Sequence, residues 1–221
     1  MRPKTSENRV IMKLILKTDF VDYYDNHFDQ LSQPVPHMTF NRLTRNNFSR
    51  QDLFNQLNKM NEPVIPHGNT KELSERFWSA QKFVVYIDDY AHSGQGKILI
   101  DRHQVPQYTN TLASLYMPEK PALSLKKIVI GNRIFWAKYQ SSHTWKSNVG
   151  DYTELHEPYE DLGINNKLFP LYTIDYVLGA NYWWAVDLNT APELGKLNLK
   201  ISPEEIHQEI KNWYERLYDY G

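Results

Sequence analysis

The chain has 221 residues, 41% of them hydrophobic and 14% aromatic, which is enough for one large domain or two small lobes with apolar cores. Its net charge of -1 gives no basic surface of the kind that binds nucleic acid or an anionic membrane. The lack of cysteine excludes disulfides, thiolate metal sites and a cysteine nucleophile, and no apolar run has the length of a membrane span, so we expect a cytoplasmic protein.

The first half of the chain predicts short elements separated by loops. Strands are indicated by β-branched and aromatic runs, and helices by apolar residues three and four positions apart. Ser49 and Thr70 are predicted to cap the two helices. In chain order we expect a strand, two helices, two strands around a glycine-rich loop, and a helix or strand, over residues 10–17, 49–60, 70–80, 82–90, 98–102 and 109–119.

The second half predicts an antiparallel sheet and a closing helix. Residues 125–142 form two apolar runs around Gly131 and Asn132, which is typical of a hairpin. Residues 171–189 predict a second hairpin that turns through residues 179–181, and a helix capped by Ser202 follows. The sequence therefore predicts an α+β fold.

Two aspartates lie on the strands of the second predicted hairpin. The position of the turn predicts that Asp175 and Asp187 face each other, with Asn189 on the same face as Asp187. Facing carboxylates repel unless a cation lies between them, and two carboxylates with an amide oxygen suit Mg²⁺. If a metal alone offsets this repulsion, Asp187→Asn leaves the ligand-free fold intact or slightly more stable. The alternative is an exposed aspartate matched by a nearby lysine, in which case the same change lowers stability.

The segment "LFPLYTIDYVLGANYWWAVDLNTAPEL" resembles the metal-binding hairpin of the ATP-grasp superfamily, with Asp175, Asp187, Asn189 and Pro192 on the matching positions. Upstream, "SLKKIVIGNRIFWAKYQSSHTWKSNVG" is similar to the segment that precedes this hairpin in the superfamily. The matching residues there are Lys126, Gly131, Trp145, Lys146, Asn148 and Gly150. The resemblance covers roughly residues 80–200.

The stretch "FVVYIDDYAHSGQGKILI" resembles the nucleotide-gripping strand and glycine-rich flap of the superfamily. Gly94 and Gly96 would let backbone N–H groups approach phosphate oxygens, and Lys97 would add positive charge. The superfamily's strand usually carries a lysine before the flap, and "VVYIDD" has none, so Lys97 and Lys82 are the two candidates to replace it. "LASLYMPE", with Tyr116, resembles the strand against which adenine packs.

The resemblance implies a two-lobed ATP-grasp-like fold with a nucleotide site in the cleft between the lobes. It divides the chain into a short N-terminal lobe (1–75) and an ATP-grasp-like region (76–221), in which 76–120 hold the flap and 121–221 hold the metal-binding sheet and closing helix. It also implies a ligase that uses ATP and Mg²⁺ to join a small-molecule or peptide carboxylate to an amine, with Lys126, Lys146 and Asn148 as catalytic residues. The alternative is a nucleotide-binding or regulatory protein on the same scaffold without turnover, which the absent strand lysine favours.

Overall fold

The computed structural model describes residues 12–17, 38–43, 49–90, 96–117, 122–141, 145, 151–155, 171–189, 199, 201–202, 204–206, 208–210 and 212–213. The strands are β1 (Met12–Lys17), β2 (Met38–Leu43), β3 (His67–Asn69), β4 (Lys82–Tyr86), β5 (Lys97–Asp101), β6 (Leu112–Leu115), β7 (Ala122–Ile130), β8 (Arg133–Ser141), β9 (Asp151–Leu155), β10 (Leu171–Gly179) and β11 (Tyr182–Asn189). The helices are α2 (Arg50–Lys59), α3 (Thr70–Arg76) and the 3-10 helix η2 (Arg102–Gln107), and residues 204–206, 208–210 and 212–213 are also helical.

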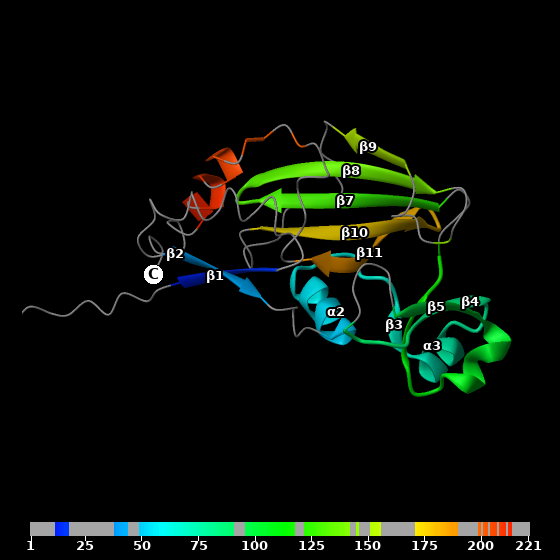
Figure 1. Cartoon of the computed structure of the whole chain (residues 1–221). Helices are drawn as coiled ribbons and strands as arrows, with labels where there is room; N and C mark the ends of the chain where they lie inside the picture. The colour runs from blue at the N-terminus through cyan, green and yellow to red at the C-terminus, as the bar shows by residue number, and fades with distance from the viewer. Residues whose placement is uncertain are drawn as a thin grey trace, which may run out of the picture.

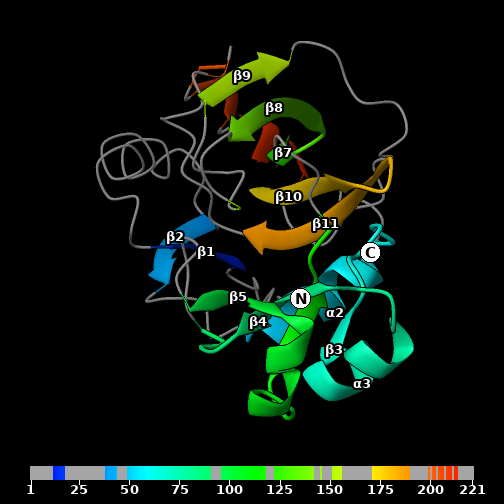
Figure 2. The ribbon, with the colours of Figure 1, turned by 90° about the vertical axis from the view of Figure 1, so that its right-hand side faces the viewer.

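Two antiparallel sheets form the body of the molecule. The larger has five strands in the order β11-β10-β7-β8-β9, and the smaller has four in the order β3-β6-β4-β5, while β1 and β2 form a separate parallel pair. Figure 1 shows the larger sheet above α2 and the smaller sheet with α3 below it and to the right, and Figure 2 shows the same arrangement from the side. The predicted α+β fold with an antiparallel C-terminal sheet is confirmed.

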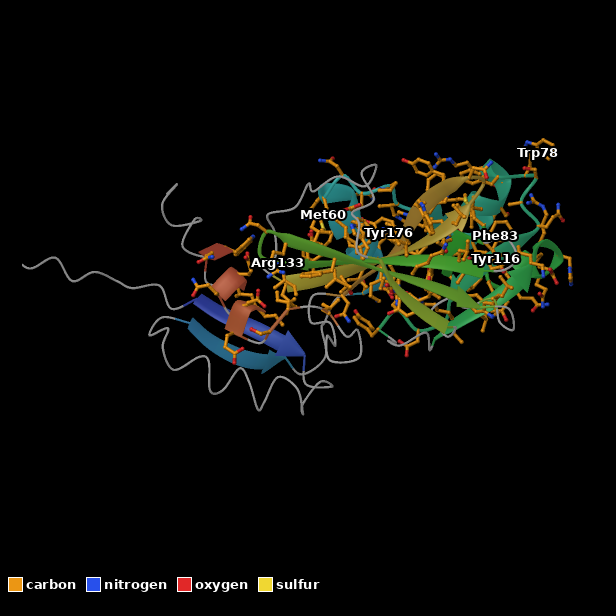
Figure 3. The ribbon with its side chains drawn as sticks, turned by 90° about the horizontal axis from the view of Figure 1, so that it is seen from above. Met60, Trp78, Phe83, Tyr116, Arg133 and Tyr176 are labelled. Atoms are coloured by element: carbon orange, nitrogen blue, oxygen red, sulfur yellow. The ribbon has the colours of Figure 1, made fainter. Side chains whose placement is uncertain are left out.

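Helix α2 forms where the sequence predicts it and covers one face of the larger sheet. Ser49 caps it, and Ser49 and Asp52 exchange hydrogen bonds in a capping box. Its apolar residues lie in the main core with residues of β10 and β11, and Figure 3 labels Met60, at its C-terminal end, and Tyr176 of β10. Helix α3 is capped by Asn69 and not by the predicted Thr70. The Asn69 side chain accepts a hydrogen bond from the Lys71 N–H, and Thr70 is the first residue of the helix.

Strand β4 joins the two sheets because both of its faces are buried. Phe83 and Val85 lie in the core of the smaller sheet, whereas Val84 and Tyr86 lie in the main core with α2 and β10. This alternation is the period of a strand buried on both sides. It places the end of β4 beside the start of α2, where the Arg50 N–H donates to the Asp89 carbonyl at 2.9 Å.

The hairpin of β10 and β11 has a tight turn and one irregularity. Ala180 and Asn181 both have positive φ, +52° and +59°, as a two-residue hairpin turn requires. Val186 is an extra residue between the pairs Tyr176–Ala185 and Asp175–Asp187, so it forms a β-bulge. Without this residue the turn would place Asp175 opposite Val186, and Asp187 would point to the other face of the sheet.

Three further sequence predictions can be compared with the structure. Residues 112–115 of the ambiguous segment form a strand, β6. The Ser202 hydroxyl accepts the Glu205 N–H at 3.2 Å, as predicted for the cap of the last helix. Strand β3 precedes the boundary predicted at residue 75 but pairs with β6, so hydrogen bonds cross it, and the division into lobes stays a prediction. Within the described part of the chain, no helix is both long and apolar enough to cross a membrane.

Candidate functional site

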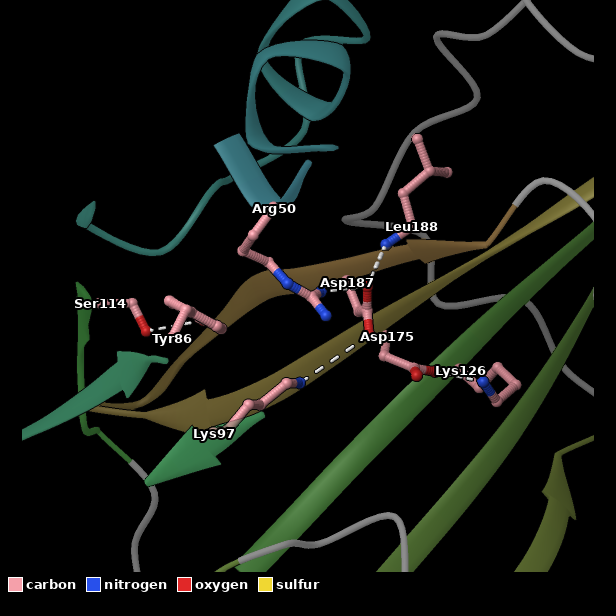
Figure 4. A network of polar contacts seen from close by, with 8 residues as sticks. All are labelled: Arg50, Tyr86, Lys97, Ser114, Lys126, Asp175, Asp187 and Leu188. Atoms are coloured by element: carbon pink, nitrogen blue, oxygen red, sulfur yellow. Dashed lines mark hydrogen bonds and ion pairs between the residues drawn. The ribbon is translucent and has the colours of Figure 1, made fainter. Parts of the chain in front are cut away.

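Five charged side chains from five elements converge where the two sheets meet. We call them the ion cluster: Arg50 of α2, Lys97 of β5, Lys126 of β7, Asp175 of β10 and Asp187 of β11 (Figure 4). Three are cations and two are anions, so the cluster has one positive charge in excess. Lys97 belongs to the smaller sheet and Asp187 to the larger one, which makes the cluster a contact between the sheets.

The register of the larger sheet places Asp175 between a cation and an anion. Its Cα partner on β11 is Asp187, and its partner on β7 is Lys126. Directly opposed residues lie on the same face, and the Lys126 ammonium donates a hydrogen bond to the Asp175 carboxylate. The pairing of the two aspartates is therefore confirmed, and an opposite charge on the third strand offsets their repulsion.

Asp187 contacts two further cations. The Arg50 guanidinium donates to its Oδ1 at 2.5 Å, and the Lys97 ammonium lies 3.9 Å from its Oδ2. Partial burial raises the pKa of the Asp187 carboxyl, but the charges of Arg50 and Lys97 lower it more, so this pKa lies below its ordinary value. Asp187 is accordingly ionised at neutral pH.

Arg50 is the member of the cluster that the sequence analysis missed. Its side chain is only 3% exposed. Burial by itself lowers the pKa of the guanidinium, but the Asp187 carboxylate raises it above the ordinary value. Arg50 lies three and four residues before Leu53 and Phe54, which places an arginine on the apolar face of α2. That position was the available signal, because a buried arginine needs an anionic partner.

Tyr86 lies beneath two of the cations at the end of β4. The Arg50 guanidinium carbon lies 5.3 Å from the centre of its ring, and the Lys97 ammonium lies 5.9 Å from it. The Tyr86 hydroxyl is hydrogen-bonded to the Ser114 hydroxyl at 3.0 Å. Burial raises the pKa of Tyr86, and Arg50 and the Ser114 hydrogen bond offset only part of this effect.

The raised pKa of Tyr86 predicts a pH-dependent contribution to stability. A buried phenol that must stay neutral contributes its full stability below the ordinary tyrosine pKa of about 10, and this contribution is lost as the pH rises through the folded-state pKa. We expect Tyr86→Phe to cost about 1 kcal/mol near pH 8, for the lost hydrogen bond to Ser114. Urea unfolding near pH 10.5 should show a smaller difference from the wild type. A difference that stays constant or grows would contradict this prediction.

The geometry distinguishes the two lysines that could replace the absent strand lysine. Lys97 is opposite Tyr86 in the ladder of β4 and β5, and its ammonium lies in the ion cluster. Lys82 is at the other end of β4, where it lies 3.7 Å from Asp101 on the exposed surface. Lys97 is therefore the candidate that joins the site, and Lys82 is distant from it along the strand.

The structure describes only some of the other predicted site residues. The backbone of Gly96 has a φ of +64°, and its carbonyl accepts the Ile87 N–H at 2.9 Å. Tyr116 is half-buried, and its ring packs edge-on against Trp145 with the centres 6.4 Å apart. Asn189 is half-buried and is the Cα partner of Thr173, two pairs beyond the aspartates and therefore on the same face. Gly94, Lys146 and Asn148 lie outside the described residues.

The donor set on this face fits Mg²⁺ that is shared with phosphate oxygens. Asp175 and Asp187 supply opposed carboxylates, and Asn189 supplies an amide oxygen on the same face. Among the residues that the structure describes, no group of three or more His, Asp or Glu side chains forms a metal cage. Magnesium commonly takes one or two carboxylates and completes its shell with water and substrate phosphates, so two carboxylates are sufficient.

The ion cluster corrects the expected effect of neutralising Asp187. A ligand-free fold that is intact or slightly stabilised is the expectation when no cation lies beside the aspartates. Arg50, Lys97 and Lys126 are there, so Asp187→Asn leaves a buried guanidinium without its carboxylate. The alternative, an aspartate matched by a lysine, is correct about the partners, although the side chains of Asp175 and Asp187 are only 22% and 30% exposed.

The similarities to known proteins are similarities of structure. No family model matches the sequence, and no curated protein matches it. A RiPP-associated ATP-grasp ligase from Chryseobacterium gregarium, in complex with ADP and a leader and core peptide, has a TM-score of 0.55 at 12% identity, over 74% of this chain and 58% of that one. The D-alanine–D-alanine ligase of Bacillus anthracis has a TM-score of 0.55 at 8% identity, over 95% of this chain and 99% of that one.

A third similar structure is the ATP-grasp ligase PsnB complexed with a minimal precursor, with a TM-score of 0.53 at 8% identity over 76% of this chain. The chain spans 58% of the length of the Chryseobacterium gregarium ligase and 61% of the length of PsnB. These comparisons show that the chain has an ATP-grasp-like fold, as its sequence motifs predict.

Proposed function

We propose that this chain is an ATP- and Mg²⁺-dependent ligase that activates a carboxylate as an acylphosphate for attack by an amine or a similar nucleophile. The observation that carries the proposal is the ion cluster, in which three cations from three elements surround two opposed aspartates. An excess of positive charge beside hard oxygen ligands is the arrangement that a triphosphate with bound magnesium needs. The ATP-grasp-like fold is consistent with this proposal.

The cations of the cluster would bind the phosphates. Arg50 offers a planar guanidinium that can bind two phosphate oxygens, and Lys97 and Lys126 offer ammonium groups that follow a phosphate as its charge moves. In the ligand-free protein each of these cations contacts an aspartate. Nucleotide binding would then exchange these partners, with the cations moving to phosphate and the aspartates to Mg²⁺.

The residues present would hold the metal through Asp175, Asp187 and Asn189. Magnesium bound there would offset charge on the β- and γ-phosphates. Gly96 and Gly94 would let the flap backbone approach the phosphates, and Tyr116 would pack against adenine. Lys146 and Asn148 keep the catalytic roles that the resemblance implies.

The proposed reaction has two steps. A carboxylate oxygen attacks the γ-phosphorus, the bond to the β-phosphate oxygen breaks, and ADP leaves. An amine then attacks the acylphosphate carbonyl, phosphate leaves, and the amine gives up a proton to form an amide. Lys126 would stabilise the charge on the transferring phosphoryl group. The similar ligase structure that holds a leader and core peptide makes a peptide carboxylate the first substrate class to test.

A second candidate is a nucleotide-binding protein without turnover on the same scaffold. The observation that favours it is Tyr86, which stands at the end of β4 where the superfamily's strand usually carries a lysine. Lys97 supplies positive charge from the neighbouring strand, but a cation from a different strand does not guarantee the alignment that phosphoryl transfer needs.

Calorimetry with ADP tests the nucleotide site directly. We expect ADP to bind in the presence of Mg²⁺ and to bind at least about tenfold more weakly when the metal is chelated. Phosphate release from ATP, measured with peptide and small-molecule acids and amines, then separates the ligase from the protein without turnover. If ADP with Mg²⁺ shows no binding at millimolar concentration, both candidates are wrong.

A further inference from the structure

A buried ion pair lies on the face of the larger sheet opposite to the ion cluster. Lys127 follows Lys126 on β7, so its side chain points to the face that α2 covers. Its ammonium donates to Glu62 Oε1 at 2.7 Å, and the Tyr176 hydroxyl donates to Glu62 Oε2 at 2.7 Å. We call these three residues the buried triad.

Burying the triad costs free energy, because two charged side chains are removed from water. The side chains of Lys127 and Glu62 are 0% and 3% exposed, and the core around them is apolar. A pair of charges that is removed from water often stabilises a fold no better than apolar side chains of similar volume. Its advantage is directional, because hydrogen bonds between charged groups fix the partners in one position.

Glu62 of the triad directly precedes the segment that covers the edge of β11. Glu62 is followed by Pro63, Val64 and Ile65, and the Ala185 N–H donates to the Pro63 carbonyl at 2.8 Å. The Ile65 N–H donates to the Ala185 carbonyl at 3.0 Å, and Val64 forms a parallel bridge with Ala185. Both backbone groups of Ala185 are therefore held from the outer side of the sheet.

Ala185 is the residue before the bulge that sets the direction of Asp187. On its inner side Ala185 pairs with Tyr176, whose hydroxyl belongs to the triad. Val186 is the extra residue, and Asp187 resumes the pairing opposite Asp175. A strand edge held on both sides at Ala185 confines the irregularity to Val186, which keeps Asp187 on the same face as Asp175.

We propose that Glu62, Lys127 and Tyr176 are positioning residues that hold the bulge at Val186 and thereby direct Asp187 into the ion cluster. The role in metal-dependent nucleotide binding rests on the proposed function, whereas the role in holding the bulge does not. Tyr176 connects the buried triad to the bulge, because its backbone pairs with Ala185 while its hydroxyl donates a hydrogen bond to Glu62.

Tyr176→Phe tests the proposal because it removes one hydrogen bond from Glu62 and leaves the ion pair with Lys127. In the ligand-free protein, we expect the Ala185 amide to exchange with deuterium about tenfold faster than in the wild type. We also expect the ratio of ADP affinities with and without Mg²⁺ to fall about fivefold, since a misdirected Asp187 weakens metal binding specifically. Tyr172→Phe is the matched control, since Tyr172 is a buried tyrosine on the same strand and face and should change neither measurement.

Two results would overturn the proposal. One is an Ala185 amide that exchanges at the wild-type rate in Tyr176→Phe. The other is faster exchange with an unchanged ratio of affinities, which would leave the triad a purely structural role. If the wild type binds no ADP at all, the proposed function fails, and the exchange rate alone decides whether the triad holds the bulge.

Discussion

Replacing Asp187 with asparagine is expected to abolish the Mg²⁺ dependence of ADP binding and to lower the stability of the ligand-free protein. The stability should fall by roughly 2–3 kcal/mol, because the buried Arg50 guanidinium loses the charged carboxylate that accepts its hydrogen bond at 2.5 Å. Urea unfolding without ligand measures this effect. Calorimetry with ADP, with and without Mg²⁺, measures the Mg²⁺ dependence of ADP binding.

A metal-free polyphosphate separates the two roles of Asp187. In the ligand-free protein this carboxylate contacts Arg50 and Lys97, so it competes with phosphate for both cations. We therefore expect Asp187→Asn to bind tripolyphosphate more tightly than the wild type in the absence of metal, although it binds ADP with Mg²⁺ more weakly. Asp187→Asn is expected to change the two affinities in opposite directions, because the carboxylate both ligates the metal and repels phosphate.

Asp101→Asn is the matched control for this variant. Asp101 also pairs with a lysine, Lys82 at 3.7 Å, but both side chains are about half exposed, at 51% and 48%. An exposed pair contributes at most about 1 kcal/mol, so this change should alter stability little and nucleotide binding not at all. A destabilised Asp187→Asn that keeps the Mg²⁺ dependence of the wild type would assign Asp187 a structural role alone.

Sequence patterns are sufficient to predict the helices, strands and turns that a local period or a short motif determines. Helix α2 follows from the Ser49 cap and its apolar residues, and the hairpin of β7 and β8 follows from the Gly131–Asn132 turn. The pairing of Asp175 with Asp187 was predicted from the turn position. The structure reaches the same pairing by a tighter turn and a bulge, and a pattern of residues does not show which residue of a strand will be the extra one.

The partners of the aspartates could not be found from local patterns because they come from distant parts of the chain. Arg50 precedes Asp187 by 137 residues, and Lys126 meets Asp175 because β7 lies beside β10 in the sheet. Lys126 and Asp175 are both site candidates in the sequence, but their local patterns do not show that they pair. The strand order determines this contact, and the strand order is a tertiary property.

The buried triad is a further feature that residue types alone conceal. Lys127 directly follows Lys126 in the sequence, and a pair of lysines ordinarily indicates a solvated surface. On a strand the two side chains point to opposite faces, so one enters the ion cluster and the other enters the core. Glu62, in the segment after α2, is the anionic partner that allows the Lys127 side chain to lie in the core.

The second large effect is expected from Lys97→Met, which should weaken ADP binding in the presence of Mg²⁺ by about tenfold or more. Lys97 lies opposite Tyr86, and it brings to the cluster the charge that "VVYIDD" lacks on its own strand. The ligand-free stability should change little, because the closer contact of Asp187 is with Arg50 and that contact remains. Calorimetry with ADP and urea unfolding measure the two quantities.

Lys82→Met is the control that makes this prediction specific. Lys82 and Lys97 are on neighbouring strands and each lies near an aspartate, at 3.7 Å and 3.9 Å, but only Lys97 is within the ion cluster. Lys82→Met should therefore bind ADP as the wild type does, and Lys97→Arg should keep most of the affinity because it keeps the charge. Equal losses in Lys97→Met and Lys82→Met would mean that general charge attracts the nucleotide, and a loss in Lys82→Met alone would place the phosphates at the other end of β4.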